Sequence, residues 1–554
     1  MNEELSGGQV IARQLALAGI DTCFGIVAGP MIPAMYALRR EGIRFIGCRH
    51  EEQAVFMAQA WGYLTGRPGV VMTGSGPGTT NTVTGLLAAQ ANGWPVVVLG
   101  GSGLARERGL GSFQETDQVR ALAPFCKWAV EVDSVERIPQ YLHLALGKAV
   151  SGRPGPVYLD FPGELPGQRV AAEAVRFVHQ APRVTRPQPD AAAIEETARL
   201  LAEAERPLIL IGKGAAWAGA GPALERLVGL GLPFLASPMG RGVVPDDDPR
   251  NAGSARSLAL RQADVVLMMG GRFNWIFHYG RPPRFAEGAR IVQVDVVAEE
   301  LYSGAPVELG LVADCAAAAE ALYEALRGRR LRCQDTGWLE GLRREAERGQ
   351  AQIEELLRSD ARPVSPYRLW GEVRDVLPRE ATVVMEGEVI MAVGRQMQPA
   401  YRPKQILNAG TSACMGTGVP YAIGAKLARP EGPVVAVLGD SAFGFSAMEV
   451  ETAARVGAPV VFVISNNQGV TGNRGRTQAP AWPQLPEASA LLPARYEMMA
   501  EMVGGYGVCV EEPEGIRPAL EAALASGRLA IVNVMTDPSF RSPLAERAGP
   551  SMMY

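Results

Sequence analysis

A repeated unit of a short apolar segment, a glycine-containing turn and a helical segment runs along this sequence and limits what it can fold into. The apolar segments lead into turns such as GVVMTGSGPG, LILIGKGAA, VVLMMGGRF, VVAVLGDSAF and VVFVISNNQG. Strands that are apolar throughout, rather than on alternate residues, are buried on both faces. Their alternation with helices predicts parallel sheets covered by helices on both sides. The predicted fold class is therefore α/β, with doubly wound parallel sheets.

The chain has 554 residues, which is more than a single hydrophobic core usually organises. Proline- and glycine-rich segments indicate two linkers, one around 166–190 and another around 330–365. Division at these linkers predicts three doubly wound parallel-sheet domains and a C-terminal tail, at 1–167, 188–330, 363–535 and 536–554. Each predicted domain is close to the usual domain size.

The first and third predicted domains contain similar segments. From Pro68 and again from Pro433 the chain runs through a strand pattern, a glycine-rich turn, a helical pattern and a second strand pattern. A duplicated module would explain this similarity. Any two strand–helix–strand units resemble each other, however, so the sequence leaves both interpretations open.

Composition excludes several classes of protein. The hydrophobic share of 47% and the charged share of 20% are those of a globular protein. The net charge is −4 and there is no block of basic residues, which argues against a nucleic-acid partner. No apolar run has the length of a membrane span, and the first residues lack a signal-peptide pattern. The seven cysteines show no metal-binding spacing, so we expect buried thiols in a reducing compartment, the cytoplasm.

Polar residues follow two apolar segments near the C-terminal end. Asp440 comes directly after one segment, and Asn466 and Asn467 end the next. Because neighbouring parallel strands end at the same edge of a sheet, Asp440 and Asn467 can converge there. A carboxylate and an amide oxygen suit a Mg²⁺ ion that carries a phosphate ester. The alternative is an aspartate that caps a helix, with two asparagines in a loop.

The segment 439–469 resembles the diphosphate-anchoring motif of thiamine-diphosphate-dependent enzymes, although Ser441 stands where the commonest form has glycine. The resemblance implies pyrimidine-binding, central and diphosphate-binding domains, in that order. It also implies that thiamine diphosphate and Mg²⁺ are the cofactors. The implied Mg²⁺ ligands are Asp440, Asn467 and the backbone carbonyl of Gly469, and the implied cofactor contacts here are Gly439, Ser441, Ala442 and Asn467.

The N-terminal domain contains the counterpart of this motif. In CRHEEQAVFM, Glu51 occupies the place of the family's catalytic glutamate, which hydrogen-bonds a ring nitrogen of the cofactor's aminopyrimidine. Glu52 is the alternative, since either carboxylate could simply begin a helix. Pro77 and Asn81 resemble the loop beside the pyrimidine, and Met415 resembles the large apolar residue that keeps the cofactor bent. Because different subunits of this family hold the two halves of the cofactor, the resemblance implies a dimer or a tetramer.

Within this family the chain is most similar to 2-hydroxyacyl-CoA lyases and oxalyl-CoA decarboxylases. The similarity implies an acyl-CoA substrate and a carbon–carbon lyase that releases formyl-CoA and an aldehyde or ketone, in a reversible reaction. The stretch 238–285 carries much of the similarity, and a glycine turn with arginines suits phosphates of coenzyme A. The expected CoA contacts are Met239, Gly240, Arg241, Ser254, Arg256, Arg272 and Asn274. The central domain could hold ADP or CoA.

Phe113 and Gln114 favour the lyase, because oxalyl-CoA decarboxylases tend to carry a Tyr-Glu pair at the matching positions. Gln114 is the candidate for orienting the substrate's oxygen. The alternatives are an oxalyl-CoA decarboxylase, an acetolactate-synthase-like enzyme and, from another class, a non-catalytic nucleotide- or CoA-binding protein. The intact Glu51, Asp440 and Asn467 argue against the last of these.

Two regions complicate the resemblance. Val389 and Ala392 stand where relatives usually have Asn and Asp, which leaves the substrate size and the anchoring of CoA open. The tail resembles the segment that closes over the active site in this family, and Arg541 and Arg547 could cover the CoA thioester. Terminal segments can instead be disordered.

Overall fold

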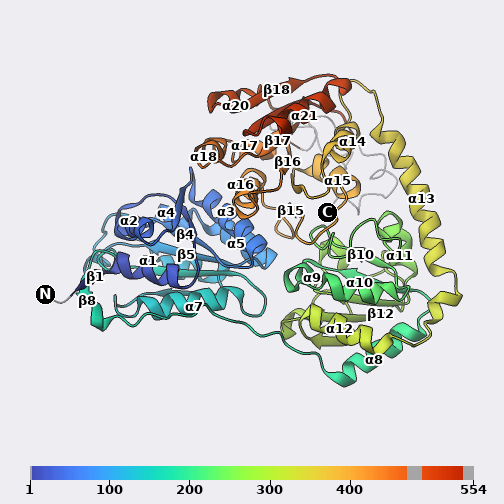
Figure 1. Ribbon diagram of the computed structural model, residues 1–554, viewed down its shortest axis with the longest axis horizontal. Coiled ribbons are helices and arrows are strands. Elements are labelled where there is room, and N and C mark those ends of the chain that lie inside the picture. Colours follow the sequence, from blue (N-terminus) through green and yellow to red (C-terminus); the bar gives the residue numbers. More distant parts are fainter. Residues whose placement is uncertain (1–2, 471–488, 541–554) are drawn as a thin grey trace.

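The apolar segments form three parallel sheets in the computed structural model, which describes residues 3–470 and 489–540 (Figure 1). The predicted α/β fold class is confirmed. Each predicted domain range contains one of these sheets, and the boundaries of the ranges remain a proposal. Within the described residues, no helix is both long enough and apolar enough to cross a membrane.

The N-terminal sheet has the strand order β3-β2-β4-β5-β7-β6. Its strands are β2 Thr22–Gly25, β3 Arg44–Gly47, β4 Gly69–Thr73, β5 Val96–Gly101, β6 Trp128–Glu131 and β7 Pro156–Phe161. Its helices are α1 Gly7–Leu17, α2 Ile32–Arg40, α3 Glu51–Thr65, α4 Pro77–Thr80, α5 Val83–Asn92, α6 Gln118–Leu122 and α7 Ile138–Val150. A small antiparallel pair, β1 Glu4–Ser6 and β8 Arg169–Ala171, lies beside the sheet.

The central sheet has five strands in the order β10-β9-β11-β12-β13. They are β9 Pro207–Ile211, β10 Phe234–Ala236, β11 Val265–Met269, β12 Arg290–Asp295 and β13 Leu309–Val312. The accompanying helices are α8 Ala191–Glu203, α9 Lys213–Ala218, α10 Gly221–Gly229, α11 Arg256–Gln262 and α12 Cys315–Leu326. The order reverses at β9, so the turns after β9 and β11 flank a crevice of the kind in which α/β sheets bind ligands.

The C-terminal sheet has the order β15-β14-β16-β17-β19-β18. Its strands are β14 Thr382–Glu386, β15 Ile406–Asn408, β16 Val434–Gly439, β17 Val461–Asn466, β18 Tyr506–Val510 and β19 Ala530–Met535. Its helices are α14 Pro366–Val376, α15 Glu388–Met397, α16 Gly418–Ala428, α17 Asp440–Gly444, α18 Glu449–Arg455, α20 Met498–Met502 and α21 Ile516–Ala525.

The N-terminal and C-terminal sheets have the same topology. When the strands of each six-stranded sheet are numbered along the chain, both sheets read 2-1-3-4-6-5. The segments that look alike in the sequence therefore occupy equivalent places, since β4 and β5 correspond to β16 and β17. Shared topology favours the interpretation of a duplicated module.

Helices α3 and α16 pack against each other and join these two domains (Figure 1). Gly424 makes this close crossing possible, because a Cβ there would lie 2.4 Å from the Met57 carbonyl oxygen. Across the same contact Tyr421 donates to Gln59 Oε1, 3.3 Å away. A continuous hydrophobic core therefore runs from the N-terminal sheet into the C-terminal sheet.

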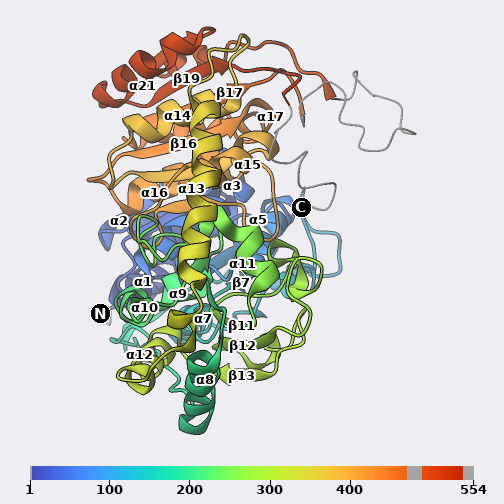
Figure 2. The same ribbon diagram turned by 90° about the vertical axis from the view of Figure 1, so that its right-hand side faces the viewer.

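The long helix α13, Trp338–Leu357, runs along the outside of the molecule from the central domain to the C-terminal domain (Figure 2). It occupies much of the second predicted linker.

All seven cysteines are free. Cys23, Cys315 and Cys333 are buried, but the other four are partly exposed, so the expectation of buried thiols is correct for only part of the set.

Candidate functional site

The C-terminal ends of β16 and β17 bring Asp440 and Asn467 together. Asp440 is the first residue of α17 and is 1% exposed. Its carboxylate accepts hydrogen bonds from the backbone N–H groups of Ser441, at 2.8 Å, and of Gly469, at 3.1 Å. Asn466 instead turns away and donates to the Ala494 carbonyl, 3.0 Å away. The pairing of Asp440 with Asn467 expected from strand order is therefore present.

The side-chain amide of Asn467 completes a cluster of polar atoms. One of its two outer atoms lies 3.0 Å from the Gly469 carbonyl oxygen and 3.1 Å from Asp440 Oδ1. With nitrogen in this position the amide donates to both oxygens. With oxygen there, three oxygens face one another and require a cation. Oxygen ligands of octahedral Mg²⁺ are about 3.0 Å from their neighbours, because each lies about 2.1 Å from the metal. The donor set and its spacing fit a magnesium ion.

Burial raises the pKa of Asp440 to about 6. Hydrogen bonds from backbone N–H groups lower this pKa, but they offset the effect of burial only in part. Its carboxylate is therefore costly to keep charged without a counter-ion. Gly439 ends β16, and Ser441 and Ala442 are in the first turn of α17, so these expected contacts line the same edge of the sheet.

Glu51 begins α3 in the N-terminal domain. His50 caps this helix by accepting the Glu52 backbone N–H at Nδ1, at 3.2 Å. The Asn81 side chain donates to Glu51 Oε2 at 3.0 Å. Asn81 directly follows the short helix α4, which Pro77 begins. Glu51, Asn81 and Pro77 are therefore neighbours, as expected, and Asn81 contacts Glu51 rather than the alternative, Glu52.

Gln114 lies beside this cluster in a constrained backbone conformation. Its φ is +56°, and its Oε1 accepts from Ser75 Oγ at 2.7 Å. Gly76 is required here, because a Cβ at that position would lie 2.6 Å from the Gln114 carbonyl oxygen. The preceding Phe113 is 83% exposed. The loop that carries Phe113 and Gln114 is thus docked on the turn that leads to Asn81.

Gln118 supports the same turn and was not identified from the sequence. It is 2% exposed and accepts the Gly76 backbone N–H at 2.6 Å. It also donates to Asp160 Oδ1, at 2.6 Å, and Asp160 accepts from Tyr158 as well. A polar network therefore anchors the turn from within the N-terminal domain, and a lone glutamine in the sequence carries no signal of it.

Met415 lies in a turn that a buried glutamate holds. Glu386, at the end of β14, is 1% exposed and accepts the backbone N–H groups of Thr417 and Gly418 at 3.1 and 2.6 Å. Burial raises the pKa of Glu386 to about 7. Met415 is 38% exposed. The two departures from the family pattern lie in the neighbouring helix α15, where Val389 is half-buried and Ala392 is exposed.

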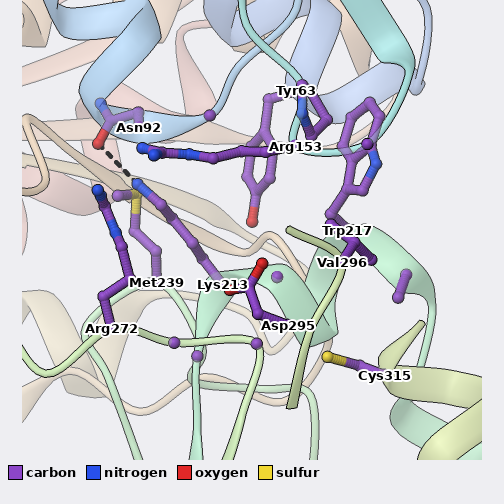
Figure 3. A pocket seen from close by; sticks show the side chains of 18 of the residues that line it. Tyr63, Asn92, Arg153, Lys213, Trp217, Met239, Arg272, Asp295, Val296 and Cys315 are labelled. Atoms are coloured by element: carbon purple, nitrogen blue, oxygen red, sulfur yellow. Dashed lines mark hydrogen bonds between the residues drawn. The ribbon is translucent and has the colours of Figure 1, made fainter. Parts of the chain in front are cut away.

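A cavity of about 430 Å³ lies where the three domains meet (Figure 3). The turns after β9 and β11 line it, as the strand order predicts, together with Asn92 and Arg153 of the N-terminal domain and Thr411 of the C-terminal domain. Tyr63 reaches into it from one side and Asp295 from the other (Figure 3). Within the described residues the Tyr63 hydroxyl is buried without a hydrogen-bond partner.

Three cations converge on this cavity. Lys213 donates to Asn92 Oδ1 at 2.9 Å (Figure 3). Arg153 and Arg272 both donate to the Ala91 carbonyl at the end of α5, at 3.0 and 2.7 Å, and both lie against Glu300. The pKa of Lys213 is well below its usual value, mainly because of burial and to a smaller extent because of repulsion from the two arginines. An anionic ligand would relieve this repulsion.

Asp295 faces these cations from the end of β12. Burial raises its pKa to about 6. A carboxylate at the end of a strand suits the hydroxyl groups of a ribose. Lys213, Arg153 and Asp295 were not identified from the sequence. Lys213, flanked by glycines after one apolar segment, and Asp295, at the end of another, were the available signals. Arg153 approaches them only through packing of the N-terminal domain against the central one.

The residues expected to contact CoA divide into two groups. Met239, Arg272 and Asn274 line the cavity. Arg241 instead pairs with Asp246 at 2.6 Å, and Arg256 donates to the Ile276 carbonyl at 2.8 Å, so both guanidinium groups are engaged by the protein. The remaining two do not line the cavity: Gly240 and Ser254. The contact of these four residues with CoA remains a prediction. Arg541 and Arg547 are outside the described residues.

Comparison with protein families places most of the chain in three matched regions. An N-terminal thiamine pyrophosphate binding domain matches residues 5–121, a central domain of thiamine pyrophosphate enzymes matches residues 194–322, and a C-terminal thiamine pyrophosphate binding domain matches residues 387–534. The first match contains Glu51 and Asn81, and the third contains Asp440 and Asn467. The second contains the turns at β9 and β11 that line the cavity.

Curated proteins are similar over almost the whole length. A 2-hydroxyacyl-CoA lyase of Oryza sativa subsp. japonica is 37% identical, with 97% of this chain and 96% of the relative covered. The 2-hydroxyacyl-CoA lyase 1 of Homo sapiens is 35% identical, with 97% and 95% covered. An oxalyl-CoA decarboxylase of Escherichia coli strain K12 is also 35% identical, with 96% and 95% covered.

Proposed function

Since this chain belongs to the thiamine pyrophosphate enzymes, we propose that it is a 2-hydroxyacyl-CoA lyase that uses thiamine pyrophosphate (thiamine diphosphate) and Mg²⁺. The reaction cleaves a 2-hydroxyacyl-CoA into formyl-CoA and an aldehyde or ketone, and it can run in reverse. The observation that carries the proposal is that Glu51 meets Asn81, and Asp440 meets Asn467 and Gly469, which would form the two halves of a cofactor site.

Asp440, Asn467 and the Gly469 carbonyl would bind Mg²⁺, and the amides at the start of α17 would face the diphosphate. When bound, thiamine diphosphate supplies an acidic carbon whose conjugate base attacks carbonyl groups and stabilises the charge left when a carbon–carbon bond breaks. The Asn467 amide atom lies 3.0 Å from the Gly469 carbonyl oxygen and 3.1 Å from Asp440 Oδ1, and this spacing supports the assignment. Met415, on the turn held by Glu386, would contact the middle of the cofactor.

Glu51 would hold a proton at the ring nitrogen of the aminopyrimidine. Asn81 donates to Oε2 of its carboxylate, which leaves Oε1 available for the ring. Oε1 faces Gly78, where a Cβ would lie 3.3 Å away. The glycine therefore keeps open the side of the carboxylate on which the pyrimidine has to lie.

Gln114 would orient the hydroxyl or carbonyl oxygen of the acyl group. Its side-chain oxygen accepts from Ser75, so its amide nitrogen remains to donate to the substrate. Phe113 beside it is apolar and exposed, which suits an alkyl-bearing acyl group better than a second carboxylate. This pair of residues favours the lyase over an oxalyl-CoA decarboxylase, which is the second candidate.

The central cavity would hold an adenine nucleotide, either ADP or the nucleotide part of CoA. Lys213, Arg153 and Arg272 would face its phosphates, and Asp295 would accept from the ribose. The unpartnered hydroxyl of Tyr63 offers a further hydrogen bond. Met239 and Asn274 would complete the lining.

We also infer that the working enzyme is a dimer or tetramer in the cytoplasm. Large apolar side chains are exposed near both half-sites, among them Phe113 at 83% and Phe445 at 64%. Phe445 follows α17 directly, so it lies beside Asp440 in the fold. A contiguous exposed apolar patch marks an association surface, and we infer that these side chains belong to such a patch. A second copy would cover them.

The test is product analysis by mass spectrometry of enzyme supplied with thiamine diphosphate and Mg²⁺. Formyl-CoA is offered with a panel of aldehydes and ketones, and oxalyl-CoA and pyruvate are offered in parallel. We expect a new 2-hydroxyacyl-CoA, and formation of formyl-CoA when that product is returned to the enzyme. Formyl-CoA from oxalyl-CoA alone would assign the chain to the decarboxylases. Acetolactate from pyruvate would assign it to the acetolactate-synthase-like enzymes.

A further inference from the structure

The turn that presents Glu51 is held by a helix from the other end of the chain. This turn, Cys48, Arg49 and His50, connects β3 with α3, and Glu51 is the first residue after it. Helix α18 of the C-terminal domain contacts the turn and the end of β3. The contacts join residues of the N-terminal domain to residues that follow Asp440 by 9 and 15 positions along the chain.

Glu449 makes the central contact. Its side chain is 1% exposed, and Oε1 accepts the Arg49 backbone N–H at 2.8 Å. The His50 backbone also lowers the pKa of this carboxyl in part. Oε2 accepts from Thr452 Oγ1 at 2.6 Å, which fixes the rotamer of Glu449. The carboxylate therefore binds the Arg49 N–H group just before the helix that Glu51 begins.

Further contacts surround Glu449. Arg455 donates to the Gly47 carbonyl at 2.6 Å, at the end of β3. Arg44 donates to the Val456 carbonyl at 2.5 Å. Arg49 and Glu451 lie 3.8 Å apart and add an exposed ion pair, which contributes little. The segment 44–50 is thus held at both ends of its turn by α18 and the residue after it.

Burial of a carboxylate costs free energy that neutral core packing avoids. Glu449 recovers part of this cost through its hydrogen bonds, and burial still raises its pKa above the usual value. An apolar residue could fill the same buried position but could not bind the Arg49 N–H group of the turn. What the glutamate adds is a fixed position for that turn.

We propose that Glu449 is a positioning residue for Glu51, and that it holds the Arg49–His50 turn so that the Glu51 carboxylate stays in line with Asn81 and the pyrimidine. This inference rests on the proposed role of Glu51 as the residue that holds the pyrimidine proton. The segment of chain that carries the metal ligand Asp440 then also sets the geometry of the catalytic glutamate. Glu449 itself touches neither cofactor nor substrate in this assignment.

The experiment compares Glu449→Asp, Glu449→Gln and Glu51→Gln. Aspartate keeps the charge but is one methylene too short to reach Arg49, whereas glutamine keeps the reach and an acceptor oxygen. Glu497→Ala is the matched control, because Glu497 is also a 1% exposed glutamate of the C-terminal domain and accepts from Asn533 at 2.8 Å. For each variant, hydrogen exchange of peptides covering 44–57 is measured without cofactor. The deuterium exchange rate at the acidic carbon of bound thiamine diphosphate is measured by NMR.

We expect Glu449→Asp to slow deuterium exchange at the cofactor carbon by about tenfold. This is less than the loss of about 10²–10⁴-fold expected when an acid–base group itself is removed. The exchange rate of Glu449→Gln should stay within about threefold of that of the unaltered protein. Amide exchange of segment 44–57 should rise in the aspartate variant, and thiamine diphosphate affinity should stay within about twofold. Glu497→Ala should leave cofactor exchange unchanged. If the exchange rate is unchanged in Glu449→Asp but falls strongly in Glu51→Gln, the positioning role of Glu449 is overturned and the proposed role of Glu51 stands. An unchanged rate in Glu51→Gln would overturn the proposed role of Glu51.

Discussion

At the scale of single residues, the candidate site depends on how each carboxylate is surrounded. Glu51 is half-buried at a helix start and hydrogen-bonded by Asn81. Asp440 is almost wholly buried among backbone N–H groups. The first arrangement suits proton transfer to a ligand, and the second suits a cation. We therefore propose separate tasks for the two acids, because their environments differ.

Replacing Glu51 by glutamine should lower turnover by about 10²–10⁴-fold, because the amide cannot hold the pyrimidine proton. Asn81 can still contact the glutamine, so thermal unfolding should change little. Steady-state kinetics and circular dichroism measure both effects. Glu52→Gln is the matched control and should retain most activity. Near-normal turnover of Glu51→Gln would contradict the assignment.

Metal binding should depend on pH through Asp440. Because burial raises the pKa of this carboxyl to about 6, it is largely protonated below that pH in the cation-free protein. Mg²⁺ binds the ionised form, so its affinity should fall by up to about tenfold for each pH unit below 6 and level off above about 7. Calorimetric titration of Mg²⁺ with thiamine diphosphate at pH 5, 6 and 7.5 measures this. Equal affinities at pH 5 and 7.5 would show that Asp440 is not a ligand.

At the scale of secondary-structure elements, strands and turns could be predicted because their signals are local. The apolar segments became β4, β9, β11, β16 and β17. Asp440 and Asn467 could be paired from the sequence, since the ends of neighbouring parallel strands share an edge. Gln118, Glu386 and Glu449, which hold the turns of the site, could not be identified from the sequence. Their hydrogen-bond partners lie far away in the sequence or are backbone atoms. The same holds for Arg153 at the cavity.

The turn after β15 connects the cavity to Met415 through Asn92. The Asn92 amide donates to the Ala409 carbonyl at 3.2 Å, and its oxygen accepts from Lys213. Asn92→Ala leaves the buried Lys213 ammonium without this partner, while the Ala409 carbonyl keeps its hydrogen bond from Ser412 Oγ at 3.0 Å, and the change should lower the free energy of unfolding by about 1–3 kcal/mol. Denaturant unfolding measures the loss, and titration with ADP or CoA should show weaker binding.

Gln90→Ala is the control for this prediction. Gln90 lies on the same helix, α5, and its side chain donates to the Pro124 carbonyl at 3.3 Å near the surface. Its loss should change the stability by no more than about 0.5 kcal/mol. If Asn92→Ala is as mild as Gln90→Ala, Asn92 does not connect the cavity with the turn.

At the scale of the whole molecule, two domains with the same strand order carry the two proposed half-sites, and the third provides much of the lining of the cavity. Within one chain, α3 and α16 bind the first and third domains tightly together. The exposed Phe113 and Phe445 lie beside opposite half-sites. A second copy related by two-fold symmetry could cover both and complete two equivalent sites.

The central claim is that Glu51 of one copy and Asp440 of another form one catalytic site. The most direct measurement is lyase activity of Glu51→Gln and Asp440→Asn chains, assayed separately and after co-expression. Each variant alone has a defect in every site and should be inactive. In random two-fold dimers about a quarter of all sites should combine two unaltered halves, so about a quarter of the activity should return. No recovery in co-expressed dimers would show that both residues act within one chain and would contradict the shared site.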